Sequence, residues 1–301
     1  IAVNALQAIA PGRCTVAVVG TPGKIVALES MLRIASNFTG EFGGYVPTYR
    51  FRKTSQEQHH NGSVTIVSNS EYIAPTFARA ADITTLAPFV AASDIYAIQE
   101  FEVQMRLGYT IVSKATCRAV IYPTGLDQSV IVHQQEQLLQ NALNNSDTNA
   151  VVSAASVLAK VVAQDTNATR VESATTRVLE SLGTTIAANN VTMSRGEREN
   201  SIAVLTTLTS VANFSKNSST QVLAMVTNII GTAKSAAICA KNPEDALCES
   251  TIGGSGDGSA AEDALVVVSR LPTTPEQTKT IEVIARTVAA GAALGESVSI
   301  T

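Results

Sequence analysis

Seven asparagines stand in Asn-x-Ser/Thr sequons without an intervening proline, the acceptor pattern for N-linked glycosylation. They are Asn37, Asn61, Asn144, Asn167, Asn190, Asn213 and Asn217. Because a glycan needs an exposed attachment point, the sequons predict surface positions that carry N-linked glycans. Those from Asn144 to Asn213 recur every 23 residues, between apolar-periodic segments, which fits a degenerate helical repeat or, as we favour, four helices of similar length. A polar surface without sugar is the alternative interpretation.

Four cysteines offer the second kind of chemistry. Cys14, Cys117, Cys239 and Cys248 allow three disulfide pairings. Pairing Cys14 with Cys117 and Cys239 with Cys248 keeps each bond within one half of the chain. A zinc site would need close cysteine spacing or nearby histidine ligands, and no histidine lies near Cys239 in the sequence. We therefore expect disulfides, which persist in oxidising compartments.

Two glycine-rich segments resemble catalytic or binding motifs only in part. Gly20-Thr21-Pro22-Gly23-Lys24 lacks the further glycine of a phosphate-binding loop, since Val18 stands there, and Ile25 replaces the Ser or Thr after the lysine. We expect a β-turn instead. In Gly253-Gly254-Ser255-Gly256-Asp257, the aspartate stands where a nucleophile elbow has its last glycine. Serine hydrolysis is therefore not predicted.

The remaining candidates for metal binding are also weak. His59 and His60 are adjacent, so on a strand they would point to opposite faces; we expect a solvated loop rather than a metal pair. Asp257, Glu262 and Asp263 lack the spacing of an EF-hand, and we expect a solvated acidic helix start. No paired-carboxylate or Cys/His constellation is evident in the sequence. We expect no catalytic residues, no metal, and no cofactor other than N-linked glycans.

The composition excludes two classes of protein. Charged residues make up 15% of the 301 residues and the formal net charge is −4, so a basic patch for nucleic acid is not expected. No run of about 18 apolar residues is present, so we expect no transmembrane segment in this stretch. Aromatic residues reach only 4% and Trp is absent. The chain begins with Ile1, which we interpret as a processed chain or an excerpt.

The hydrophobic pattern divides the chain into two domains, residues 1–122 and 123–301. In the first, alternating apolar residues predict short strands around 14–19, 64–66, 101–107 and 117–121, separated by turn signals. Such a series is typical of an immunoglobulin-like or fibronectin-like β-sandwich, with cysteines on its first and last strands. The expected fold class is α+β, because the period changes in the second domain.

The second domain has the 3.6-residue period of helices. Its narrow apolar stripes and many small residues predict a closely packed antiparallel α-helical bundle. The stripes include Leu138, Leu139 and Leu143; Val151, Ala155, Leu158 and Val162; Val171, Val178 and Leu182; Leu205 and Leu208; Val222, Met225 and Ile229; and Ile281, Ile284 and Val288. Thr274-Pro275-Glu276-Gln277 has the capping signature of a helix start. Residues 252–258 predict a surface loop by their composition.

Several strings in the β half resemble a known family. They are Gly12-Arg13-Cys14-Thr15-Val16 with Gly23, Pro47-Thr48-Tyr49-Arg50-Phe51, the strand 101–107, and Ala115-Thr116-Cys117-Arg118-Ala119-Val120. The chain resembles, over about residues 12–240, the fibronectin-like units of the receptor-for-egg-jelly (REJ) module of polycystin-like proteins. Its helical half is similar to the GAIN-like helical region that precedes the autoproteolysis site of adhesion receptors. The resemblance implies a glycosylated ectodomain, although no Trp- and Cys-rich proteolysis motif follows the helices.

From these patterns we expect a non-enzymatic, glycosylated structural or adhesion module. It would belong to a polycystin-like ectodomain or to an extracellular filament such as a ciliary mastigoneme, secreted or on the cell or ciliary surface. Its partners would be other extracellular domains or copies of itself. A carbohydrate- or glycoprotein-binding receptor domain is the alternative; it needs an exposed aromatic platform, whose candidates Tyr45, Tyr49 and Tyr72 we expect mostly in the core. An enzyme would require a deep pocket with perturbed ionisable groups.

Overall fold

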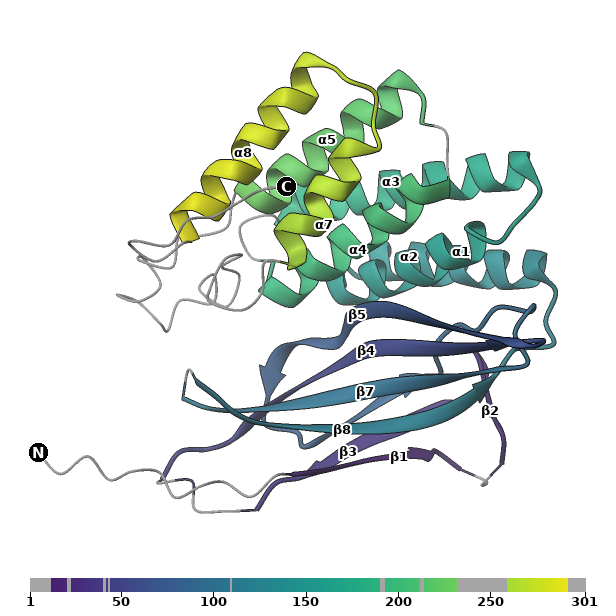
Figure 1. The fold of residues 1–301 in the computed structure, drawn as a ribbon, viewed down its shortest axis with the longest axis vertical. Coiled ribbons are helices and arrows are strands. Elements are labelled where there is room, and N and C mark those ends of the chain that lie inside the picture. The colour runs from purple at the N-terminus through teal and green to yellow at the C-terminus, as the bar shows by residue number, and fades with distance from the viewer. Residues whose placement is uncertain are drawn as a thin grey trace, which may run out of the picture. The chain divides into compact units, whose positions relative to one another are not determined.

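The fold is α+β, as predicted, with strands in the first part of the chain and helices in the second (Figure 1). The computed structural model describes residues 12–20, 23–39, 42, 44–108, 110–189, 193–211, 214–231 and 259–291. The chain divides into two compact units, Ile1–Gly125 and Leu126–Thr301, which we call the β unit and the helical unit.

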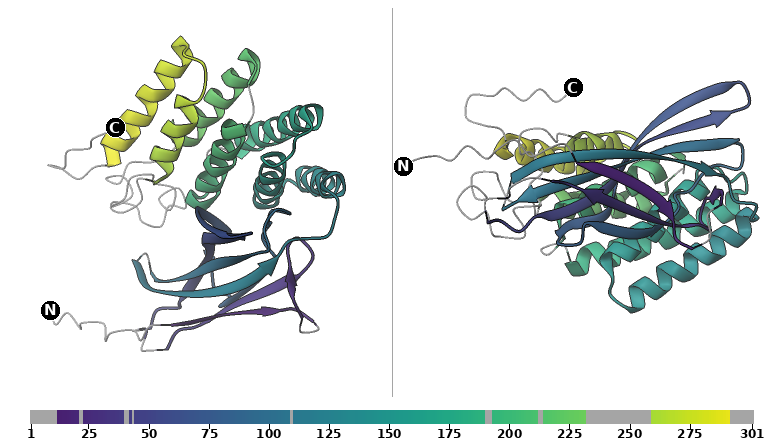
Figure 2. Two further views of the ribbon diagram at one scale, coloured as in Figure 1. Left: turned by 45° about the vertical axis from the view of Figure 1, so that its right-hand side comes forward. Right: turned by 90° about the horizontal axis from the view of Figure 1, so that it is seen from below.

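The β unit contains two sheets, which Figure 2 shows from two further sides. Its strands are β1 (Arg13–Val18), β2 (Ile25–Val26), β3 (Met31–Asn37), β4 (Thr48–His60), β5 (Ser63–Ala78), β6 (Asp82–Leu86), β7 (Tyr96–Leu107) and β8 (Thr110–Tyr122). The smaller sheet has the order β1-β3-β6 and the larger one the order β2-β8-β7-β4-β5. Neighbouring strands run antiparallel, apart from β2 and β8, which are parallel.

Side chains from both sheets form one hydrophobic core. Leu32 and Ile34 of β3 belong to the same buried cluster as Phe101, Val103 and Met105 of β7, and all five are fully buried. The alternation predicted for 101–107 is confirmed at Phe101, Val103 and Met105, which lie on one face of β7 and belong to this core. Burial of apolar area from two sheets is the main term that stabilises such a unit.

The solvated loop predicted at His59 and His60 is wrong, since both residues belong to β4. This strand continues through a polar stretch and forms a long hairpin with β5, closed by the pair His60 and Ser63. Gly62 at the tip has a φ of 88°, which glycine adopts without steric cost. Polarity did not prevent strand formation, because the side chain of Gln56 donates to the carbonyl of Phe89.

The helical unit contains seven helices within the described residues. They are α1 (Gln128–Asn144), α2 (Thr148–Val162), α3 (Ala168–Asn189), α4 (Arg195–Val211), α5 (Lys216–Gly231), α7 (Ser259–Ser269) and α8 (Pro275–Gly291). Helix α2 packs against α1, α3 and α4, while α5 packs against α3 and α8. None of the described helices has the length and apolar character needed to cross a membrane.

The apolar stripe predicted for α2 is confirmed. Val151, Ala155, Leu158 and Val162 are all at most 1% exposed. Small residues let neighbouring helices approach α2 closely; Ala159, for example, is fully buried.

Two other members of the predicted stripes are exposed, and Leu143 and Val171 are only partly buried. Leu138 in α1 is 49% exposed and Ile281 in α8 is 41% exposed. Leu139 in α1 and Ile284 in α8, which belong to the same predicted stripes, are buried. The buried face of each of these helices is therefore narrower than predicted.

Candidate functional site

A disulfide joins the two sheets of the β unit. Cys14 in β1 of the smaller sheet is bonded to Cys117 in β8 of the larger sheet, with the two Cα atoms 5.2 Å apart. The bond closes a loop with a sequence separation of 103 residues, which spans nearly the whole unit. The predicted pair Cys239 and Cys248 lies outside the described residues.

Five of the seven sequon asparagines lie in described parts of the chain, and all five are exposed. Asn37 ends β3 and Asn61 lies in the β4–β5 turn, whereas Asn144 ends α1, Asn167 precedes α3 and Asn217 lies in the first turn of α5. Asn190 and Asn213 lie outside the described residues. The four evenly spaced sequons bracket helices of unequal length, with 22 residues in α3 and 17 in α4.

The sequon at Asn144 forms the C-terminal cap of α1. The amide of Ser146 donates to the carbonyl of Leu143, and the amide of Asp147 donates to that of Ala142, which is the Schellman pattern. Ser146 occupies the left-handed position of this cap, with a φ of 55°. Glycine is the usual residue at this position, because a side chain there costs free energy.

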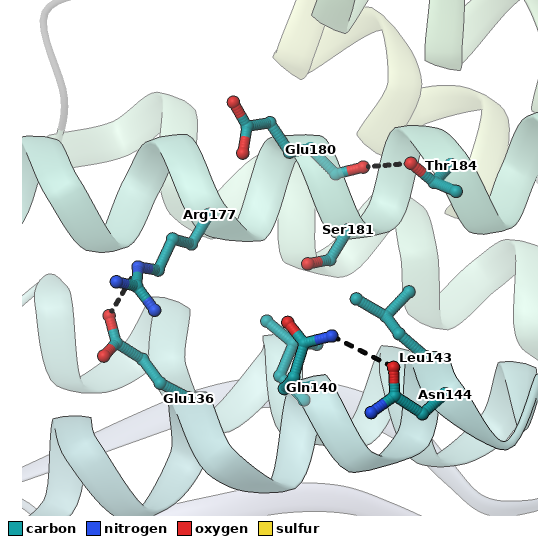
Figure 3. Close-up of a pocket in the computed structure, with 9 residues that line it drawn as sticks. Glu136, Gln140, Leu143, Asn144, Arg177, Glu180, Ser181 and Thr184 are labelled. Atoms are coloured by element: carbon teal, nitrogen blue, oxygen red, sulfur yellow. Dashed lines mark hydrogen bonds and ion pairs between the residues drawn. The ribbon is translucent and has the colours of Figure 1, made fainter.

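A polar groove runs between α1 and α3 and ends at this cap (Figure 3). The cavity has a volume of about 540 Å³. An ion pair of 3.3 Å between Arg177 and Glu136 lies at one end, and Asn144 lies at the other. Leu139 and Leu143 contribute apolar surface from α1.

The lining of the groove includes a serine hydroxyl that makes no hydrogen bond to the described residues. Ser181 of α3 is 8% exposed and points toward α1 (Figure 3), and among the described residues its hydroxyl makes no hydrogen bond. In contrast, the hydroxyl of Thr184 donates to the carbonyl of Glu180 within the same helix. This hydroxyl is open to the groove, where it can bond to water or to a ligand.

A row of rings crosses the larger sheet on the face opposite the core. His59 of β4 stacks on Tyr96 of β7 with ring centroids 4.3 Å apart, and Tyr96 lies 6.2 Å from Tyr122 of β8. The ammonium group of Lys24 lies 4.8 Å from the centroid of the Tyr122 ring. The three rings are partly exposed, because their neighbours Ala97 and Ile121 take the core positions.

Sequence reasoning missed this row and considered other tyrosines. Tyr49 and Tyr72 are buried, as expected, with 8% and 3% exposure, whereas Tyr45 is 59% exposed. The signal for the row is strand register, since His59 pairs with Tyr96 and the next pair in β7 and β8 joins Ala97 and Ile121. Register depends on pairing between distant segments and was not available from periodicity alone.

The adjacent His60 faces a buried carboxylate. Its Nδ1 atom lies 2.6 Å from Oδ1 of Asp94, whose side chain is fully buried. Neither oxygen of Asp94 accepts a hydrogen bond of good geometry within the described part of the chain. Burial raises the pKa of Asp94, and the electrostatic interaction with His60 opposes this shift only in part.

The other predicted motifs gain no support as catalytic sites. Residues 253–257 and Thr21 with Pro22 lie outside the described residues. Among the residues that the structure describes, no group of three or more His, Cys, Asp or Glu side chains could hold a metal ion. No family model, curated protein or solved structure matches the chain.

Proposed function

We propose that the chain is a glycosylated extracellular module that bears load or mediates adhesion and that catalyses no reaction. The observation that carries the proposal is the disulfide between Cys14 and Cys117. Disulfides persist in secreted and cell-surface proteins, and they are rare where thiols are kept reduced. The five described sequon asparagines are all exposed, as attachment of N-linked glycans requires.

The position of the disulfide suits transmission of force. Tension that enters the β unit at Cys14 reaches Cys117 through the sulfur–sulfur bond, so the loop between them carries none of it. The strands inside the loop then need not resist extension through their hydrogen bonds. The module would pass tension to residues beyond Cys117 while its core stays folded.

In this proposal the β unit is an immunoglobulin- or fibronectin-like sandwich and the helical unit an antiparallel bundle. Two sheets with a shared core support the first part. A connection of only three residues between α1 and α2 supports the second, because short connections favour antiparallel neighbours. The resemblance of the sequence to REJ modules supports a polycystin-like ectodomain or a filament such as a ciliary mastigoneme as the setting of the chain. Its partners would be extracellular domains or its own copies.

Mass spectrometry of protein purified from its native source tests this function. We expect a peptide pair cross-linked through Cys14 and Cys117 without reduction, and N-glycans on exposed sequons such as Asn61. Free thiols at both cysteines together with unmodified sequon asparagines would contradict the proposal. Alkylation before denaturation guards against disulfide exchange during preparation.

A second candidate function is carbohydrate binding, favoured by the aromatic row of His59, Tyr96 and Tyr122. Faces of aromatic rings suit stacking by the C–H faces of sugars, and Lys24 adds a donor beside Tyr122. A glycan array probed with the wild-type chain and with Tyr96→Ala tests this function. Binding that is lost in Tyr96→Ala supports it, and an array without binding contradicts it.

A further inference from the structure

We propose that the groove between α1 and α3 holds the first N-acetylglucosamine of a glycan on Asn144, so that the helical unit binds its own modification. The inference rests on the proposed N-glycosylation of the chain. It adds a binding site, the lining residues of that site, and a reason for the unusual cap of α1. The occupant is tethered at the end of the groove, because Asn144 itself lines the cavity.

The carboxamide of Asn144 leaves its nitrogen available for a glycan. Its Oδ1 atom accepts a 3.2 Å hydrogen bond from Nε2 of Gln140. Its Nδ2 atom, to which the sugar is attached, makes no hydrogen bond among the described residues. Glycosylation therefore displaces no protein contact, and the bond from Gln140 restricts the rotation of the carboxamide.

The lining matches the chemistry of N-acetylglucosamine. This sugar has an apolar acetyl methyl group and ring face, together with an amide and hydroxyl groups. Leu139 and Leu143 offer apolar surface, and the unpartnered hydroxyl of Ser181 offers a hydrogen bond to the acetamide. The cavity volume of about 540 Å³ falls within the range of small-molecule sites.

The cap of α1 gives a second, independent argument. Ser146 stands at a left-handed position, where glycine would be more stable. The same serine supplies the hydroxyl that the sequon requires, so glycine here would abolish glycosylation of Asn144. A residue that is unfavourable for the helix end is thus the residue that the modification needs.

Thermal unfolding of the full chain in two forms tests the inference. One form is secreted by cells that attach N-glycans and is trimmed to a single sugar at each site; the other comes from a bacterial periplasm, where no glycan is attached. In the glycan-free form we expect Ser146→Gly to raise the Tm of the helical unit, because it relieves the cap. In the glycosylated form the same change should lower the Tm by about 2–4 °C, because the bound sugar is lost.

Two further variants serve as controls. Ser181→Ala keeps the sequon, and it should lower the Tm only in the glycosylated form. Ser63→Ala removes the sequon of Asn61, which lies in the exposed hairpin turn, and it should leave the Tm unchanged in both forms.

Three results would overturn the proposal that the sugar on Asn144 lies in the groove. A Ser146→Gly variant that is stabilised equally in both forms would overturn the inference, because the sugar would then make no contact with the groove. Mass spectrometry that finds Asn144 unmodified while other sequons carry glycans would overturn it too, and would leave the proposed function intact. Only unmodified sequons throughout, with free thiols, would overturn both.

Discussion

The Nε atom of Arg52 lies 2.8 Å from Oε1 of Glu102, its register partner across β4 and β7. Nε2 of Gln104 donates to the same oxygen over 2.6 Å. Burial opposes ionisation of Glu102, but the hydrogen bonds from Arg52 and Gln104 and the charge of Arg52 outweigh it, so the pKa of this carboxyl is lowered from 4.5. The ionised pair therefore stabilises the β unit.

We expect Glu102→Gln to reduce the free energy of unfolding by about 1–3 kcal/mol at pH 7, because a charged acceptor is lost in a buried place. Since the folded pKa is lowered, the contribution is complete above pH 4.5 and disappears as the pH falls through the folded value. Urea unfolding from pH 7 to pH 3 measures both effects. Glu100→Gln is the control: its partner Arg118 is 65% exposed, so the loss should stay below about 1 kcal/mol. Equal losses in the two variants would contradict the prediction.

Asp94 has the opposite dependence on pH. Its pKa is raised, chiefly by burial, so the protonated form is favoured in the folded state. Its contribution to stability is complete below pH 3.8 and is lost as the pH rises through the folded pKa. We expect Asp94→Asn to match or exceed the wild type in stability at pH 7, and to lose this relative gain under acidic conditions. Urea unfolding at pH 7 and pH 3 measures it, and a variant that is much less stable at pH 7 would show that the contact with His60 outweighs burial.

Loss of the disulfide should change both stability and extension. We expect the double variant Cys14→Ser and Cys117→Ser to reduce the free energy of unfolding by about 2–5 kcal/mol, because the unfolded chain gains freedom. In single-molecule pulling, release of the 103-residue loop should add roughly 350 Å to the extended length of the β unit. The oxidised wild type should not show this step, and dithiothreitol should restore it. The same length with and without reductant would contradict the role of the bond in carrying load.

Periodicity predicted the elements whose burial follows from local pattern. The alternation in β7 and the stripe of α2 identified Phe101 and Leu158 as core residues, because a face that repeats every 2 or 3.6 residues can be read without knowing its partner. The strand at the polar end of β4 could not be predicted from periodicity. Its residues are paired by partners distant in sequence, as Gln56 is with Phe89, and such partners satisfy polar groups that would otherwise favour solvent.

The candidate site also combines features that follow from local sequence with features that depend on distant partners. Sequons identified Asn144 directly, because the acceptor pattern is local. The groove beside it depends on the packing of α1 against α3, and the unpartnered hydroxyl of Ser181 depends on which face of α3 meets α1. Neither can be derived from one helix alone. The left-handed conformation of Ser146 could not be predicted either, because a serine residue does not by itself indicate a positive φ.

The start of α8 provides a local prediction that the structure both supports and refines. The hydroxyl of Thr274 accepts a hydrogen bond from the amide of Gln277, and the helix begins at Pro275, as the capping signature predicts. The side chain of Gln277 does not return to Thr274; its Nε2 donates to the carbonyls of Val268 and Leu271 at the end of α7. The cap therefore also joins two helices.

We expect Thr274→Ala to reduce the free energy of unfolding of the helical unit by about 1 kcal/mol, the usual cost of losing a capping hydroxyl. Gln277→Ala should cost more, because it leaves two buried carbonyl groups at the end of α7 without this donor. Thr278→Ala, at an exposed position on the same helix, is the control and should change stability by less than about 0.5 kcal/mol. Urea unfolding followed by circular dichroism measures all three variants. A Gln277→Ala variant no less stable than Thr274→Ala would contradict the link between the two helices.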